Sequence, residues 1–187
     1  MTYAYYPKII LPVKRNLQDT SYGCGPACMK IILETLGIRL SEKRLMHLCG
    51  TTPTKGTSPQ AMIDLLKKLK VDFEVINHAT MEMIEEKIRG LNLCIVDYQA
   101  WGRGGSEYRR LDTGHYSVVF GYNKTHLWIA DPAKHRTEDY KKWGTRKMRK
   151  DFFAEHWADK EEQGTKTYRW MIAVPLLQTK LRRRNKE

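Results

Sequence analysis

Residues 18–28 read Gln-Asp-Thr-Ser-Tyr-Gly-Cys-Gly-Pro-Ala-Cys and lead into an apolar run at helical spacing. The glycines at 23 and 25 allow a tight turn, and Pro26 is tolerated only in the first turn of a helix. Cys24 is therefore predicted to lie where a loop enters a helix. The free N–H groups and partial positive charge of a helix N-terminus favour the thiolate, which is the nucleophilic form of cysteine. A free cysteine is usually a small buried apolar residue, so a catalytic role for Cys24 also requires a base.

A predicted β-hairpin supplies that base. Residues 115–121 and 126–130 have the pattern of two strands, and residues 122–125 form the turn between them. His115 begins the first strand and Asp131 follows the second, so antiparallel pairing brings both to the same edge of the sheet. The carboxylate can then hold the imidazole in one tautomer and orientation. Cys24, His115 and Asp131 thus form a candidate Cys-His-Asp triad.

The rest of the chain predicts an α+β fold, with N-terminal helices packed on an antiparallel β-sheet. Ile9 to Val13 is expected to be a short strand or a segment packed on the core. The expected helices cover residues 24–37, 41–49, 58–70, 80–89 and 149–157, and further strands cover 71–76, 91–98 and 168–174. The charged residues 133–148 are expected to be irregular. Residues 99–113 form a long Gly- and Arg-rich loop, which is either functional or an ordinary surface insertion.

Length and composition indicate one globular domain. A chain of 187 residues with 41% hydrophobic residues can bury a proper core. We expect a single domain over residues 1–178 and a basic, disordered tail over 179–187. No run approaches the roughly 18 apolar residues of a membrane span, and the N-terminus lacks a signal-peptide core, so a cytoplasmic protein is expected. Four cysteines are too few for a disulfide scaffold.

The positive charge is concentrated in the last third of the chain. The formal net charge is +12, and residues 134–187 hold 16 Lys and Arg against 8 Asp and Glu. This surface could bind an acidic partner, nucleic acid or a membrane surface. A solvated basic surface with a frayed tail is the favoured interpretation, because no aromatic-interleaved RNA motif or zinc-finger spacing accompanies the charge.

Four elements in order resemble the bacteriocin-processing, double-glycine-leader cysteine peptidases, which have a papain-like fold. They are Gln18, Cys24-Gly25, His115 and Asp131-Pro132-Ala133. The resemblance covers about residues 10 to 175. It implies that Cys24 is the nucleophile, His115 the general base and acid, and Asp131 the group that orients His115. It further implies that the Gln18 amide and the Cys24 backbone N–H donate to the oxyanion.

The same resemblance implies a peptide or protein substrate, and leader peptides that end in Gly-Gly are one possibility. This chemistry requires no metal and no organic cofactor. Two other functions remain open at the level of sequence. A papain-like frame with the same triad can instead act as a glutamine deamidase or an acyl transferase. Alternatively, the chain is a non-catalytic basic binding module in which Cys24 is only structural.

A zinc site is a weaker interpretation. Cys24 and Cys28 form one Cys-x3-Cys pair, while Cys49 and Cys94 are scattered singly, which is not metal-ligand spacing. Cys28 lies one helical turn after Cys24 and is expected in the core.

Overall fold

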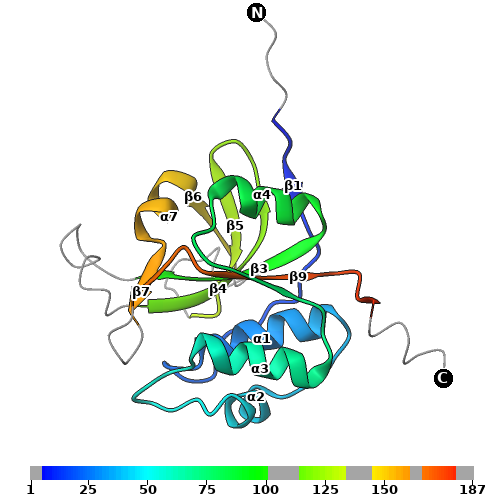
Figure 1. The fold of residues 1–187 in the computed structure, drawn as a ribbon, viewed down its shortest axis with the longest axis vertical. Coiled ribbons are helices and arrows are strands. Elements are labelled where there is room, and N and C mark those ends of the chain that lie inside the picture. Colours follow the sequence, from blue (N-terminus) through cyan, green and yellow to red (C-terminus); the bar gives the residue numbers. More distant parts are fainter. Residues whose placement is uncertain (1–5, 101–113, 134–144, 161–165, 180–187) are drawn as a thin grey trace, which may run out of the picture.

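The computed structural model describes residues 6–100, 114–133, 145–160 and 166–179 (Figure 1). Within these ranges, a seven-stranded antiparallel sheet has the strand order β2-β9-β3-β4-β5-β6, and β1 pairs with β4. Its strands are β1 (Ile9–Ile10), β2 (Glu74–Ile76), β3 (Asn92–Gln99), β4 (Gly114–Tyr122), β5 (His126–Ala130), β6 (Thr145–Arg149) and β9 (Met171–Pro175). A separate hairpin pairs β7 (Ala158–Lys160) with β8 (Lys166–Tyr168).

Helices cover both sides of the sheet. Figure 1 shows α1, α2 and α3 together on one side, and α4 and α7 on the other. Their bounds are α1 (Cys24–Thr35), α2 (Glu42–Leu48), α3 (Pro59–Leu69), α4 (Met81–Arg89) and α7 (Lys150–His156). The side chains of Ser41, Ser58 and Thr80 cap α2, α3 and α4 by accepting a hydrogen bond from a backbone N–H in the first turn.

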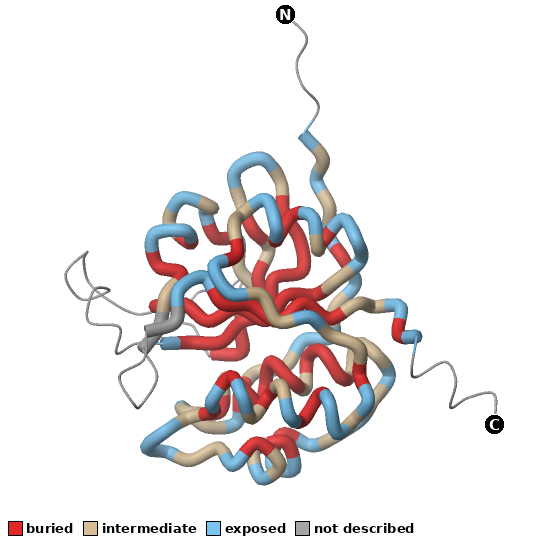
Figure 2. Tube along the Cα trace, in the orientation of Figure 1, coloured by how far each residue is buried: buried red, intermediate tan, exposed pale blue. Residues whose placement is uncertain are grey.

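The central strands are buried almost along their whole length because helices lie on both sides of them. In β3 every residue after Asn92 is buried, and in β4 every residue after Gly114 is buried. The buried residues gather where these strands meet α1 (Figure 2). Each fully buried Ile, Leu or Val side chain stabilises the fold by about 1.5–3 kcal/mol relative to exposure. The contact between α1 and β4 is therefore part of the hydrophobic core.

The α+β prediction is confirmed, with its helices and antiparallel strands close to the expected positions. The prediction that residues 133–148 are wholly irregular is wrong, because residues 145–149 form strand β6, which pairs with β5. Only Met148 in β6 is buried, so the strand lacks the strong apolar alternation that marks a strand in sequence. The strand forms because its backbone pairs with β5, a long-range contact that its own side chains do not predict.

Some predictions fall on residues that the structure does not describe. Residues 101–113 of the predicted Gly- and Arg-rich loop and residues 180–187 of the basic tail lie outside the described residues. The division into one domain and a tail stays a prediction. In the described part of the chain, no helix is both long enough and apolar enough to cross a membrane.

Candidate active site

Cys24 lies at the start of α1, as the glycines and proline around it predict. Gly23 is the N-cap residue, and Cys24 is the first residue of the helix. Gly25 allows the helix to approach the loop before α3, since a Cβ atom at position 25 would lie 2.7 Å from the Cβ of Thr57. The packing of α1 against β4 brings the half-buried Cys24 next to His115.

His115 and Asp131 form a buried pair at one edge of the sheet. The Nε2 atom of His115 lies 2.7 Å from Oδ1 of Asp131, and the two side chains are 4% and 0% exposed. His115 is the second residue of β4, and Asp131 directly follows β5, which is the adjacent antiparallel strand. Because Nε2 contacts the carboxylate, Nδ1 is the ring nitrogen that remains for the hydrogen bond to Cys24.

The electrostatics of this pair favour a thiolate and an imidazolium. Burial raises the pKa of the Cys24 thiol, but the hydrogen bond and charge of His115 outweigh it, so the pKa lies below its usual range. Burial lowers the pKa of His115, whereas the hydrogen bonds to Asp131 and Cys24 raise it to about 10. Cys24 and His115 therefore each favour the charged form of the other.

Asp131 is held by neighbours on both of its oxygens. Oδ1 also accepts a hydrogen bond of 3.0 Å from the backbone N–H of Ala133, and Oδ2 accepts one of 3.4 Å from Nη1 of Arg146. Arg146 belongs to β6 and was not among the predicted site residues. No local signal identifies it, because its position depends on the pairing of β6 with β5.

Gln18 lies beside the turn that carries Asp131. Its backbone N–H donates to the carbonyl of Pro132 at 2.8 Å, and its side chain is buried. The Nε2 atom of Gln18 donates to the carbonyl of Thr20 at 2.7 Å. Because an amide nitrogen carries two hydrogens, this bond leaves one for another acceptor. The structure thus links the Gln18 loop to the turn that holds Asp131.

The other three cysteines differ from Cys24. Cys28, Cys49 and Cys94 are buried free thiols, and burial raises the pKa of each. The pKa is about 11 for Cys49 and about 12 for Cys94. They are therefore protonated and unreactive at neutral pH, whereas the pKa of Cys24 is lowered. Among the described residues, no group of three or more His, Cys, Asp or Glu side chains is placed to hold a metal ion.

The sequence profile of the peptidase C39 family matches residues 13–160, a range that includes Gln18, Cys24, His115 and Asp131. The chain belongs to the peptidase C39 family. It is accordingly a cysteine peptidase with a papain-like fold, as the sequence resemblance implies.

Known proteins with a similar sequence or fold agree with this assignment. The Lactococcus lactis lactococcin-G-processing and transport ATP-binding protein LagD is 32% identical over 119 residues, which are 63% of this chain and 15% of LagD. A putative C39-like peptidase from Bacillus anthracis superposes with a TM-score of 0.68 at 16% identity, over 90% of this chain and 97% of that chain. The double glycine motif protease from an AMS/PCAT transporter, solved in complex with the leader peptide, gives a TM-score of 0.59 at 14% identity, over 91% and 99%. These two structural likenesses show the shared fold.

Proposed function

We propose that this peptidase cleaves leader-type peptides with Cys24 as nucleophile, His115 as general base and acid, Asp131 as the orienting group and Gln18 as an oxyanion donor. The observation that carries the proposal is the buried hydrogen bond of 2.7 Å between His115 and Asp131, next to a cysteine whose pKa is lowered. A nucleophile, a base and a group that orients the base are the parts that covalent thiol catalysis requires.

In the first step, the Cys24 thiolate attacks the carbonyl carbon of the scissile peptide bond. The carbonyl oxygen becomes an oxyanion that needs donors already in place. Cys24 begins a helix, so its backbone N–H is not used by an intrahelical hydrogen bond. The remaining amide hydrogen of Gln18 is the proposed second donor.

In the second step, the protonated His115 transfers its proton to the nitrogen of the leaving peptide, and the C–N bond breaks. A thioester to Cys24 remains. His115 then takes a proton from water, which attacks the thioester and releases the free acid and the thiolate. Asp131 keeps the imidazole oriented in both steps and stabilises its positive charge.

The proposed class of substrate, leader-type peptides, is inferred from what related proteins process or bind. LagD is named for processing lactococcin G, and the transporter protease was solved with a leader peptide bound. Membership of the same family supports a peptide substrate for this chain. The cleavage position is open to direct measurement.

The test is mass spectrometry of a peptide and protein mixture that includes double-glycine leader peptides, after incubation with the enzyme. Cys24→Ala is the blank, and Cys28→Ala is the matched control in the same helix. New fragments that need Cys24 but not Cys28 support the proposal, and their ends define the cleavage rule. Intact peptides with Gln converted to Glu would instead indicate a deamidase. Equal mixtures from enzyme and blank would contradict a catalytic role for Cys24 on these substrates.

A further inference from the structure

The loop that carries Gln18 rests on a buried carboxylate. Glu42, the first residue of α2, is only 1% exposed although it carries an ionisable group. We propose that Glu42 is a positioning residue, which holds the loop of residues 16–23 in the conformation that oxyanion binding requires. This inference rests on the proposed role of Gln18 in peptide hydrolysis.

One end of the loop is held by two direct hydrogen bonds. Oε1 of Glu42 accepts from the backbone N–H of Asp19 at 2.8 Å, and Oε2 accepts from Nδ2 of Asn16 at 2.8 Å. Asp19 directly follows Gln18. The Oδ1 atom of Asn16 accepts in turn from Nζ of Lys30, at 2.8 Å, so the second bond is tied to α1. One carboxylate thereby holds the backbone of Asp19, directly after Gln18, and the side chain of Asn16, two residues before it.

The other end of the loop lies against the same carboxylate. A Cβ atom at Gly23 would lie 3.0 Å from Oε1 of Glu42 and 2.9 Å from Oγ1 of Thr20, so the backbone at Gly23 closely approaches Glu42. Gly23 immediately precedes Cys24. The carbonyl of Thr20 accepts both from the N–H of Gly23, at 3.3 Å, and from Nε2 of Gln18, at 2.7 Å. Glu42 thus holds the loop at Asp19, next to Gln18, and lies close to the backbone where the loop ends at Gly23.

A carboxylate suits this position better than other side chains of its size. Burial raises the pKa of Glu42, although the hydrogen bonds from Asp19 and Asn16 oppose the rise. Burial of the ionised carboxylate therefore destabilises the folded state. Only an ionised carboxylate offers an acceptor at both oxygens. A glutamine has the same shape but presents an NH₂ group to one of the two donors. Glu42→Gln therefore leaves one loop contact unmade with little change in volume.

The first measurement is steady-state kinetics of Glu42→Gln. We expect kcat to fall about 10-fold with KM unchanged, since complete loss of one oxyanion donor typically lowers kcat by about 10²–10³ and this variant only loosens one. The deciding comparison is with Gln18→Ala. Because Glu42 acts through the Gln18 loop, Glu42→Gln should lower kcat by less than about 2-fold in the Gln18→Ala background.

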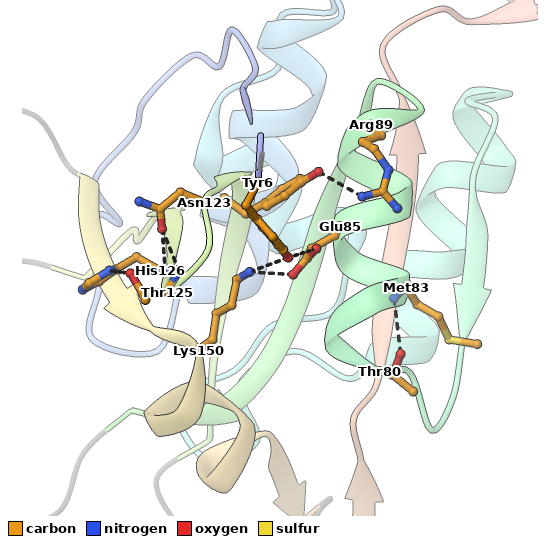
Figure 3. A network of polar contacts seen from close by, with 10 residues as sticks. Tyr6, Thr80, Met83, Glu85, Arg89, Asn123, Thr125, His126 and Lys150 are labelled. Carbon is orange, nitrogen blue, oxygen red and sulfur yellow. Dashed lines mark hydrogen bonds and ion pairs between the residues drawn. The ribbon is translucent and has the colours of Figure 1, made fainter. Parts of the chain in front are cut away.

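The matched control is Glu85→Gln, at a second buried glutamate. Glu85 belongs to α4, on the other side of the sheet, where it pairs with Lys150 and Tyr6 (Figure 3). Loss of its charge should lower the midpoint of thermal unfolding and leave kcat unchanged. An equal loss of kcat in both variants would overturn the proposal, because it would mark a general effect of destabilisation.

Two further outcomes would also overturn it. One is an equal fold-loss of kcat from Glu42→Gln with and without Gln18, and the other is a change in KM alone. If Glu42→Gln fails to fold, Asn16→Ala is the second variant. It removes the bond to Oε2, together with the bonds of Asn16 to Lys30 and to the carbonyl of Leu17, and leaves the bond from Asp19 to Oε1. Its smaller loss of kcat should likewise depend on Gln18.

Hydrogen exchange separates this proposal from the proposed function. The N–H of Asp19 should exchange faster in Glu42→Ala, which removes both acceptor oxygens, than in the unaltered protein, as measured by NMR, whether or not a substrate is known. Absence of turnover that depends on Cys24 would refute the proposed function alone. Unchanged exchange at Asp19 would refute the positioning role of Glu42 alone.

Discussion

The two sides of the sheet use buried charge differently. On the α4 side, Glu85 forms an ion pair of 2.5 Å with Lys150 and accepts a hydrogen bond from Tyr6, and the Lys150 ammonium lies 5.2 Å from the ring centroid of Tyr122. These contacts join the N-terminal segment, α4, β4 and α7 (Figure 3). Glu85 and Lys150 are partners of opposite sign, so their pairing stabilises the arrangement of these elements.

On the α1 side, the charges shift one another's protonation state. His115 lies between Asp131 and Cys24, and its pKa is raised to about 10 while that of Cys24 is lowered. Glu42 is buried against neutral donors under the adjacent loop. The comparison teaches that similar burial of charge stabilises structure on one side and lowers the pKa of the Cys24 thiol on the other.

The largest expected effect is that of Cys24→Ala. Because the nucleophile is absent, turnover should fall by a factor of about 10⁴ or more while the fold is kept. Fragment yield by mass spectrometry and the circular dichroism spectrum measure the two properties. Cys28→Ala should keep most of the activity. Retained cleavage by folded Cys24→Ala would refute the mechanism.

His115→Ala should have the next largest effect. Turnover should be nearly abolished, and the rate at which Cys24 is alkylated should depend differently on pH. In the unaltered protein, the charge of His115 lowers the pKa of Cys24, so the thiolate is populated at pH values below the usual thiol pKa. Without His115, burial is opposed only by the backbone hydrogen bonds of Tyr116 and Gly25, so the pKa of Cys24 should rise and alkylation by iodoacetamide at neutral pH should slow. The rate of alkylation as a function of pH measures this shift. An unchanged profile would show that His115 does not set the state of Cys24.

Asp131→Asn should have a smaller effect than His115→Ala. The amide can still contact Nε2, but it lacks the charge that supports the imidazolium and can favour the wrong tautomer. We expect kcat to fall by about 10²-fold or more with little change in KM. Kinetics on one defined peptide, with His115→Ala measured in parallel, test this order. A larger loss for Asp131→Asn than for His115→Ala would reverse the assigned roles.

The smallest expected effect on activity is that of Glu85→Gln, on the other side of the sheet. Removal of one partner from a mostly buried ion pair should lower the free energy of unfolding by about 3 kcal/mol, because Lys150 loses its counter-charge. Chemical denaturation measures this change, and kcat should be unchanged. Unaltered stability together with reduced kcat would remove the distinction between the two sides.

Short-range features of the fold could be predicted from sequence because their causes are local. Ser58 followed by Pro59 marks the start of α3, and the structure begins that helix at Pro59. The strand pattern of residues 126–130 gives β5 with the expected bounds. The placement of Cys24 at a helix start follows in the same way from the glycines and Pro26 around it.

Parts of the site could not be predicted because they depend on pairing between distant segments. Arg146 reaches Asp131 only because β6 pairs with β5. The sequence of β6 has too little apolar alternation to predict a strand, and only Met148 in it is buried. Glu42 has the sequence pattern of an ordinary exposed residue in the first turn of a helix. Only the fold shows it buried beneath the Gln18 loop.

The sequence by itself predicted that Cys24 begins a helix, that His115 lies at the start of a strand and that Asp131 follows the paired strand. These features are local, since turn and helix preferences act over a few residues. The sequence also carried the order of motifs that identifies the family. The tertiary structure alone decided that α1 packs on β4 and so sets Cys24 beside His115, and that the buried carboxylate of Glu42 lies under the loop that leads into Cys24. The physical reason is that burial and long-range contact set the pKa values and hydrogen bonds of a site, and neither is a local property of the chain.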